Sequence, residues 1–160
     1  MIFYLLIILM ILTSKVISKK WNFSLFFGGM LVGFFFEVYY EFCWNYSEAL
    51  RPFIWRDVSF VVILGWGTIT QLALTISEFI AKQYKITNQI MLFLADLLII
   101  YLFLFVNEQV MSAMGFWSYN NDLHPQFFAQ FFGFIFLSFI LTNVARRINY
   151  LTNLTYENEK

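Results

Sequence analysis

The sequence predicts an all-α membrane protein with about five transmembrane helices, and its composition supports this prediction. Of its 160 residues, 61% are hydrophobic, 12% are charged and 22 are phenylalanine. A water-soluble domain carries about 25% charged residues, which cover its surface. A chain of this length cannot bury so much apolar surface inside itself, so we expect a polytopic protein embedded in lipid.

Polar residues divide the chain into apolar segments that define the expected helices. A bilayer core about 30 Å thick requires about 20 apolar residues per helix. The segments that qualify cover about 1–18, 21–43, 58–80, 88–110 and 126–145. We expect residues 1–150 to form one transmembrane domain and 151–160 a polar cytoplasmic tail. The first segment lacks a preceding basic stretch and a cleavage site, so we expect a retained helix.

Lysine and arginine residues are distributed unequally between the two ends of these helices. One set of loops and the tail hold Lys15, Lys19, Lys20, Lys82, Lys85, Arg146, Arg147 and Lys160. The opposite loops hold only Arg51 and Arg56. Because positively charged loops stay in the cytoplasm, we expect the N-terminus outside and the C-terminus inside. The protein would then be a multi-pass protein of the cell membrane or of an organelle's inner membrane.

The composition excludes several classes of function. The net charge of +0 gives no electrostatic basis for binding nucleic acid. A single cysteine, Cys43, excludes an internal disulfide and a cysteine metal cluster, and the single His124 excludes the common histidine zinc sites. We therefore expect neither a metal nor a cofactor. Carboxyl groups, aromatic rings and hydroxyls must supply any chemistry.

A nine-residue phrase occurs twice, as WNYSEALRP at 44–52 and WSYNNDLHP at 117–125. Trp, Tyr, Leu and Pro coincide in register. Each copy follows an outward-running helix and precedes a returning one, which favours a duplicated helical hairpin. An aromatic belt at the membrane–water interface would explain the same residues without any function, and both interpretations remain.

Acidic residues near the outer ends of the apolar segments are the main candidates for function, because a charged side chain is costly in hydrocarbon. Glu37 and Glu41 share one helix face, and Asp57 and Glu108 fall at the same level of the membrane. Two carboxylates one turn apart in a low dielectric cannot both ionise cheaply, so one keeps its proton and is a proton donor. Aromatic rings nearby stabilise cations. This combination suits protonation of a carbon–carbon double bond in an apolar substrate.

Two further acids and a glycine pair have structural interpretations. Glu78 precedes Lys82 by four residues, which predicts a salt bridge along one helix. Gly29 and Gly33 form a small-xxx-small pair that lets helices approach closely. Asp96 either lines a polar path or bonds to a neighbouring helix at Thr68, Thr70 or Gln71.

The stretch from Glu37 to Trp66 carries a family resemblance. It reads E-x3-E-x2-W-N-Y-x3-L-R-P-x-I followed by D-V-S-F-x3-L-G-W, and residues 107–120 read N-E-Q-V-M-S-A-M-G-F-W-S-Y-N. Both stretches resemble signatures of the integral membrane proteins of carotenoid biosynthesis, the carotenoid hydratases and heterodimer-type lycopene cyclases. The cyclases are built from duplicated three-helix units, which would explain the repeated phrase.

The resemblance implies a membrane enzyme that hydrates or cyclises a long isoprenoid or carotenoid-like lipid without metal or cofactor, with lyase or isomerase chemistry. Glu37 or Glu41 would donate a proton to a terminal double bond, and Glu108 or Asp57 would take a proton back or position water. The side chains lining the substrate pocket would be Trp44, Tyr46, Trp66, Trp117 and Tyr119.

Two other functions remain as alternatives. The chain could be a non-catalytic subunit of a larger membrane complex, with its acids paired to partner helices. It could also be a small transporter or proton path through Glu37, Asp96 and Glu78, which would have to share one lumen. Besides its lipid substrate, we consider further copies of the chain or other membrane subunits as partners.

Overall fold

The computed structural model describes residues 2–18, 21–40, 43–56, 58–119 and 127–158, and within them it contains five α-helices. They are α1 (Ile2–Ser18), α2 (Phe23–Tyr40), α3 (Phe60–Gln83), α4 (Gln89–Ala113) and α5 (Phe127–Asn158). The predicted all-α class is confirmed. The boundaries lie close to those expected, except that α5 continues through Asn158, where the sequence suggested a separate tail after residue 150.

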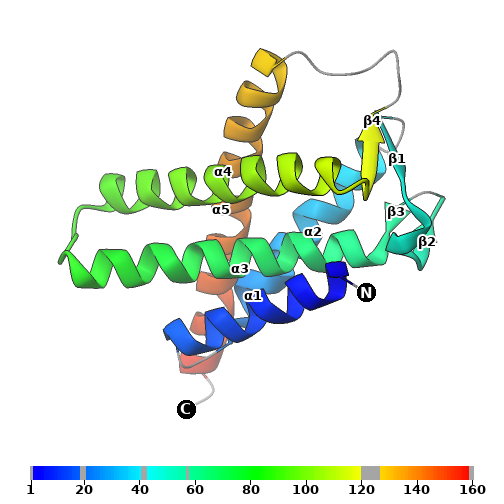
Figure 1. Cartoon of the computed structure of the whole chain (residues 1–160). Coiled ribbons are helices and arrows are strands. Elements are labelled where there is room, and N and C mark those ends of the chain that lie inside the picture. The colour runs from blue at the N-terminus through cyan, green and yellow to red at the C-terminus, as the bar shows by residue number, and fades with distance from the viewer. Residues whose placement is uncertain (1, 19–20, 41–42, 57, 120–126, 159–160) are drawn as a thin grey trace.

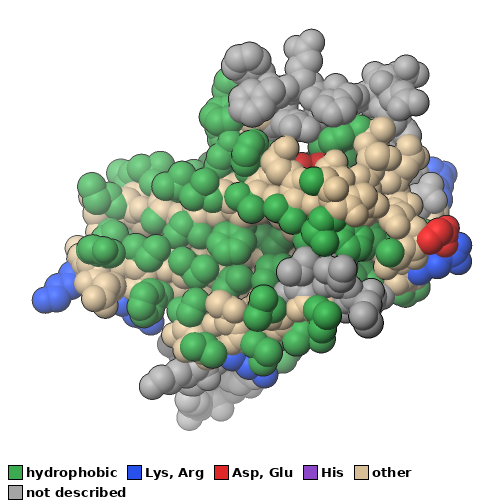
Figure 2. Space-filling view, viewed as in Figure 1, with side chains coloured by type: hydrophobic (Ala, Val, Ile, Leu, Met, Phe, Trp, Pro, Cys, Tyr) green, Lys and Arg blue, Asp and Glu red, His purple; other side chains and the backbone are tan. Residues whose placement is uncertain are grey.

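Four of these helices are long and apolar enough to cross a membrane. The spans are Phe23–Tyr40, Phe60–Gln83, Gln89–Ala113 and Phe131–Asn153, and the apolar stretch of α1, Ile7–Ile17, is shorter. Figure 2 shows hydrophobic side chains along the visible helices, with lysine and arginine side chains toward the ends and lower edge. The chain therefore has the surface of a membrane protein.

Helix α3 is the centre of the bundle. It packs against α1, α2 and α4, and α5 packs against α2 and α4. In Figure 1, α3 and α4 run side by side in opposite directions and α5 crosses behind them. The interior of α3 is polar as well as apolar, because Thr68, Thr70 and Gln71 are fully buried.

Glycines in α2 bring it close to both neighbours, and the predicted packing role of Gly29 and Gly33 is confirmed. A Cβ atom added at Gly33 would lie 2.4 Å from Cγ of Trp66 on α3. One added at Gly28 would lie 2.6 Å from the Cα atom of Ala145 on α5. Side chains at these positions would push the helices apart, so glycine fixes where α2 lies.

Short strands close one end of the bundle, and the sequence did not predict them. They are β1 (Trp44–Tyr46), β2 (Phe53–Trp55), β3 (Val58–Ser59) and β4 (Trp117–Tyr119), with a short 3-10 helix η2 at Glu48–Leu50. β1 pairs antiparallel with β4, and β2 with β3. The β1–β4 pair ties the chain leaving α2 to the chain leaving α4, as Figure 1 shows.

An ion cluster toward the opposite end of the bundle corrects two sequence predictions. Arg146 on α5 donates to both carboxylate oxygens of Asp96 on α4, each at 2.9 Å, and to the carboxylate of Glu78 on α3. The predicted partner of Glu78, Lys82, was therefore wrong, because an arginine from another helix reaches this acid. Asp96 likewise pairs with Arg146 rather than with threonine or glutamine of α3.

Candidate acid site

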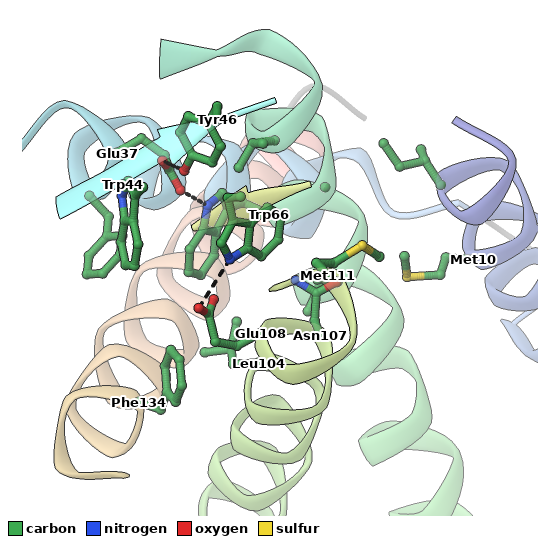
Figure 3. A pocket seen from close by; sticks show the side chains of 16 residues that line it. Met10, Glu37, Trp44, Tyr46, Trp66, Leu104, Asn107, Glu108, Met111 and Phe134 are labelled. Atoms are coloured by element: carbon green, nitrogen blue, oxygen red, sulfur yellow. Dashed lines mark hydrogen bonds between the residues drawn. The ribbon is translucent and has the colours of Figure 1, made fainter. Parts of the chain in front are cut away.

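A cavity of about 40 Å³ lies where α2, α3 and α4 meet the β1–β4 pair. Figure 3 shows its lining, with Glu37 and Glu108 entering from different helices among aromatic rings. Its walls include the aromatic and polar side chains of Phe36, Glu37, Trp44, Tyr46, Trp66, Asn107, Glu108, Trp117 and Phe134. No basic side chain is among the described residues that line it.

Glu37 on α2 is 2% exposed and accepts hydrogen bonds on both carboxyl oxygens. The hydroxyl of Tyr46 on β1 donates to Oε2, and the indole Nε1 of Trp66 on α3 donates to Oε1 at 2.8 Å. Gly33, one turn before Glu37, leaves the space that Trp66 occupies. Burial raises the pKa of the Tyr46 phenol, so this side chain keeps its proton and remains a donor.

Glu108 on α4 is 8% exposed and has a similar pair of donors. Trp117 Nε1 donates to its Oε1 at 3.1 Å, and the hydroxyl of Tyr119 donates to the same oxygen. Each buried carboxyl thus accepts from one indole and one phenol. Oε2 of Glu108, in contrast to either oxygen of Glu37, has no hydrogen-bond donor among the described residues.

The strand register joins the two carboxyl groups into one site. Trp44 lies opposite Tyr119, and Tyr46 lies opposite Trp117. The ring centroids of these pairs are 5.2 Å and 6.0 Å apart, and the second pair meets edge to face. The Trp-x-Tyr stretches of the two copies therefore pair with each other, and this pairing brings acids that are far apart in the sequence to one cavity.

A second, larger space adjoins the cavity on the surface between α2 and α5. This groove has a volume of about 690 Å³, and its lining is mainly apolar. Phe36, Trp44 and Phe134 belong to the walls of both the groove and the cavity. Cys43 and Gly133 also line the groove, and burial raises the pKa of the Cys43 thiol.

The structure brings most of the predicted site residues together. Glu37, Trp44, Tyr46, Trp66, Glu108 and Trp117 line the cavity, and Tyr119 lines the groove and binds Glu108. Glu41 and Asp57 lie outside the described residues. Within the described part of the chain, no group of three or more His, Cys, Asp or Glu side chains could hold a metal ion.

Sequence reasoning missed three residues of the site. Phe36 and Phe134 separate the cavity from the groove, and Asn107 adds an amide to the lining. Nothing distinguishes these two phenylalanines from the others in a chain that has 22. Asn107 precedes Glu108, so its position beside a predicted acid was the only available signal.

In comparisons with known proteins, no family model, curated protein or solved structure matches the chain. The resemblance to the carotenoid-biosynthesis proteins therefore remains a prediction from the motifs at Glu37–Trp66 and 107–120.

Proposed function

We propose that the chain is a membrane-embedded enzyme that protonates a carbon–carbon double bond of a long isoprenoid-like lipid. One observation carries this proposal. Two buried carboxyl groups, each bound by an indole and a phenol, line one aromatic cavity that has no basic side chain among its described lining residues. Such a pair supplies an acid and a base to an apolar substrate without a cofactor.

The proposed reaction begins when one carboxyl O–H bond breaks and a C–H bond forms at one alkene carbon. The other alkene carbon becomes a cation, and aromatic faces stabilise it. Transfer of a proton from a neighbouring carbon to the second carboxylate yields an isomerised alkene. If a second double bond of the same chain first attacks the cation, a ring C–C bond forms and the charge moves to another carbon, and loss of a proton beside that carbon to the second carboxylate yields a cyclised alkene. Capture of water, with loss of its extra proton to that carboxylate, yields an alcohol.

The hydrogen bonds favour Glu108 as the group that contacts the substrate. Its Oε2 can approach a ligand while both existing hydrogen bonds to Oε1 remain. Glu37 would have to give up the bond from Tyr46 or from Trp66 to do the same. We therefore assign the proton transfer to Glu108 and the role of second carboxyl to Glu37, whereas the sequence suggested the reverse order.

Analysis of all isoprenoid lipids, both hydrocarbons and alcohols, in a lycopene-accumulating bacterial host tests this proposal. Because a general acid contributes about 10²–10⁴-fold to the rate, we expect Glu108→Gln to reduce product formation at least about 100-fold and Glu37→Gln to reduce it less. Glu48→Gln is the matched control, since Glu48 is exposed and pairs with Arg51 outside the cavity. Products that persist at the wild-type level in both cavity variants would refute acid catalysis at this site.

The structure supports the alternatives less well. Asp96 and Glu78 are both bound by Arg146, while Glu37 shares the cavity with Glu108. A proton path through Glu37, Asp96 and Glu78 would have to connect these two separate clusters. A subunit whose acids await partner helices is also disfavoured, because all four of these acids already have partners within the chain.

We further propose that the chain is multi-pass, with the N-terminus outside and the C-terminus in the cytoplasm. Eight of its ten lysine and arginine residues belong to the segments, helix ends included, that the sequence assigns to the cytoplasmic side. We expect green fluorescent protein fused after Lys160 to fluoresce in a bacterial host and alkaline phosphatase fused there to be inactive. The opposite pair of results would invert the orientation and place the acid site at the cytoplasmic face.

A further inference from the structure

The indole of Trp44 lies at the boundary between the acid cavity and the groove. Together with Phe36 and Phe134 it forms part of both walls, and the ring centroids of Phe36 and Trp44 are 6.3 Å apart. Only side chains therefore separate the two spaces at this boundary. A chain lying in the groove would end beside Glu37 and Glu108.

The N–H group of Trp44 distinguishes it from the other two tryptophans of the cavity. Trp66 and Trp117 donate to the two carboxyl groups, whereas the buried Nε1 of Trp44 has no acceptor among the described residues. The matching indole in the second copy of the repeated phrase is Trp117, which donates to Glu108, so the two copies differ in whether this donor has an acceptor among the described residues. A buried donor without an acceptor is costly, and a ligand oxygen at this point would remove that cost.

The groove fits a lipid chain in size and chemistry. Its volume of about 690 Å³ falls within the range of about 300–1,000 Å³ typical of ligand sites. Its walls are phenylalanine, leucine, isoleucine and valine side chains, with tyrosine and tryptophan toward the strand end. It lies between two helices that carry membrane spans, so its surroundings would be hydrocarbon rather than water.

We propose that the groove between α2 and α5 binds the hydrocarbon chain of a membrane lipid that carries an oxygen acceptor near one end, and that Trp44 donates its indole N–H to that oxygen. The groove would then be the route by which substrate reaches the acid site from the bilayer. The carbons next to the oxygen would lie nearest the two carboxyl groups. This inference rests on the proposed function in treating the bound lipid as the substrate, and it makes that lipid an oxygenated one.

Cys43 provides a built-in reporter of groove occupancy. It is the only cysteine of the chain and lines the groove, so alkylation by a fluorogenic bimane reagent reads out this one position. The full-length protein in lipid nanodiscs is incubated with geranylgeraniol or with the same chain lacking the hydroxyl. We expect both compounds to slow the alkylation of Cys43. The alcohol should reach the same protection at about fivefold lower concentration than the hydrocarbon, because one additional hydrogen bond strengthens its binding by about this factor.

Two variants separate the groove from the donor. Trp44→Phe keeps an aromatic ring but removes the N–H, and we expect it to abolish the advantage of the alcohol while both lipids still protect. Gly133→Phe fills the groove, since nothing lies within 4 Å of a Cβ atom at this position, and we expect it to abolish protection by either lipid. Ile135→Phe is the matched control, because it enlarges an exposed residue of α5 outside the groove.

Each result decides a separate part of the inference. Equal alkylation rates of the wild type with and without the added isoprenoids would refute the groove as a lipid site. An advantage of the alcohol that persists in Trp44→Phe would refute the assignment of the donor. Because this assay measures binding and needs no turnover, it remains valid if Glu108→Gln shows that the acid chemistry is wrong.

Discussion

Each buried carboxyl of the cavity is oriented by one indole and one phenol. These donors satisfy both oxygens of Glu37 and Oε1 of Glu108, and they hold each carboxyl in one orientation. The donors to Glu37 come from β1 and α3, whereas both donors to Glu108 come from β4. Glu37 therefore depends on the packing of α2 against α3, and Glu108 depends mainly on the strand that follows its own helix.

The hydrogen bond from Trp66 to Glu37 should contribute measurably to the free energy of unfolding. We expect Trp66→Phe to lower the free energy of unfolding by about 1–3 kcal/mol, because it leaves a buried oxygen without its donor. In a Glu37→Gln background, Trp66→Phe should change the free energy of unfolding by a different amount, because the effects of substituting residues in direct contact are not additive. Denaturant titration in detergent measures both.

Trp55→Phe is the control for this cycle, because Trp55 is 55% exposed on β2. Additive effects of Trp66→Phe and Glu37→Gln would show that the two side chains do not interact in the folded protein. The geometry of the cavity would then need revision at this point.

The paired strands show what the repeated phrase does at the level of the element. In a strand, alternate side chains point to opposite faces, and in W-x-Y the two aromatic rings share a face. Accordingly, Asn45 and Ser118 are exposed, while Trp44, Tyr46 and Trp117 are at least partly buried. The phrase thus places aromatic rings over the cavity from both copies, whereas an interfacial belt alone would not require the copies to meet.

Close packing of α2 against α3 should be sensitive to the size of residue 33. A Cβ atom at Gly33 would lie 2.4 Å from the Trp66 side chain, and overpacking typically costs about 1–3 kcal/mol. We expect Gly33→Leu to lower thermal stability in detergent and to reduce activity, because Trp66 would be displaced from Glu37. Gly133→Ala, at an open position of α5, should leave thermal stability unchanged or raise it slightly; equal melting temperatures for both variants would contradict this packing.

At the scale of the whole molecule, the two ends of the bundle have different roles. The strand end holds the acid site, and the ion cluster of Arg146 joins α3, α4 and α5 toward the other. The side chain of Asp96 is 7% exposed, so this carboxylate depends on Arg146 for compensation. The cluster holds α3, α4 and α5 together without lining the cavity.

Removal of the arginine should therefore destabilise the protein as a whole. We expect Arg146→Gln to lower the free energy of unfolding by about 3 kcal/mol, because an uncompensated charge remains buried. Arg147→Gln is the matched neighbour, since its guanidinium lies over the ring of Tyr150 and should contribute less than about 1 kcal/mol. Comparable losses of stability in both variants, measured by thermal unfolding in detergent, would refute a special role for the Arg146 cluster.

The candidate acids could be predicted because an acid in an apolar segment is rare and conspicuous. Glu37 and Glu108 were found in this way, and the repetition of the nine-residue phrase marked its aromatic residues. Which residue bonds to which acid could not be predicted, because Trp66 is 29 positions from Glu37 and Arg146 is 50 positions from Asp96. Local spacing rules favoured Lys82 for Glu78, but a longer-range contact supplies the partner.

The sequence by itself determined that this chain is built of apolar helices, where they begin and end within a few residues except at the end of α5, and which acids lie among them. These properties follow from composition and segment length, which burial in lipid dictates directly. Only the tertiary structure decided how each helix is rotated, that the two copies of the phrase pair with each other, and that a groove meets the acid cavity. In so uniformly apolar a chain no periodic pattern marks the inward face, so glycine contacts and a few long-range hydrogen bonds set the arrangement.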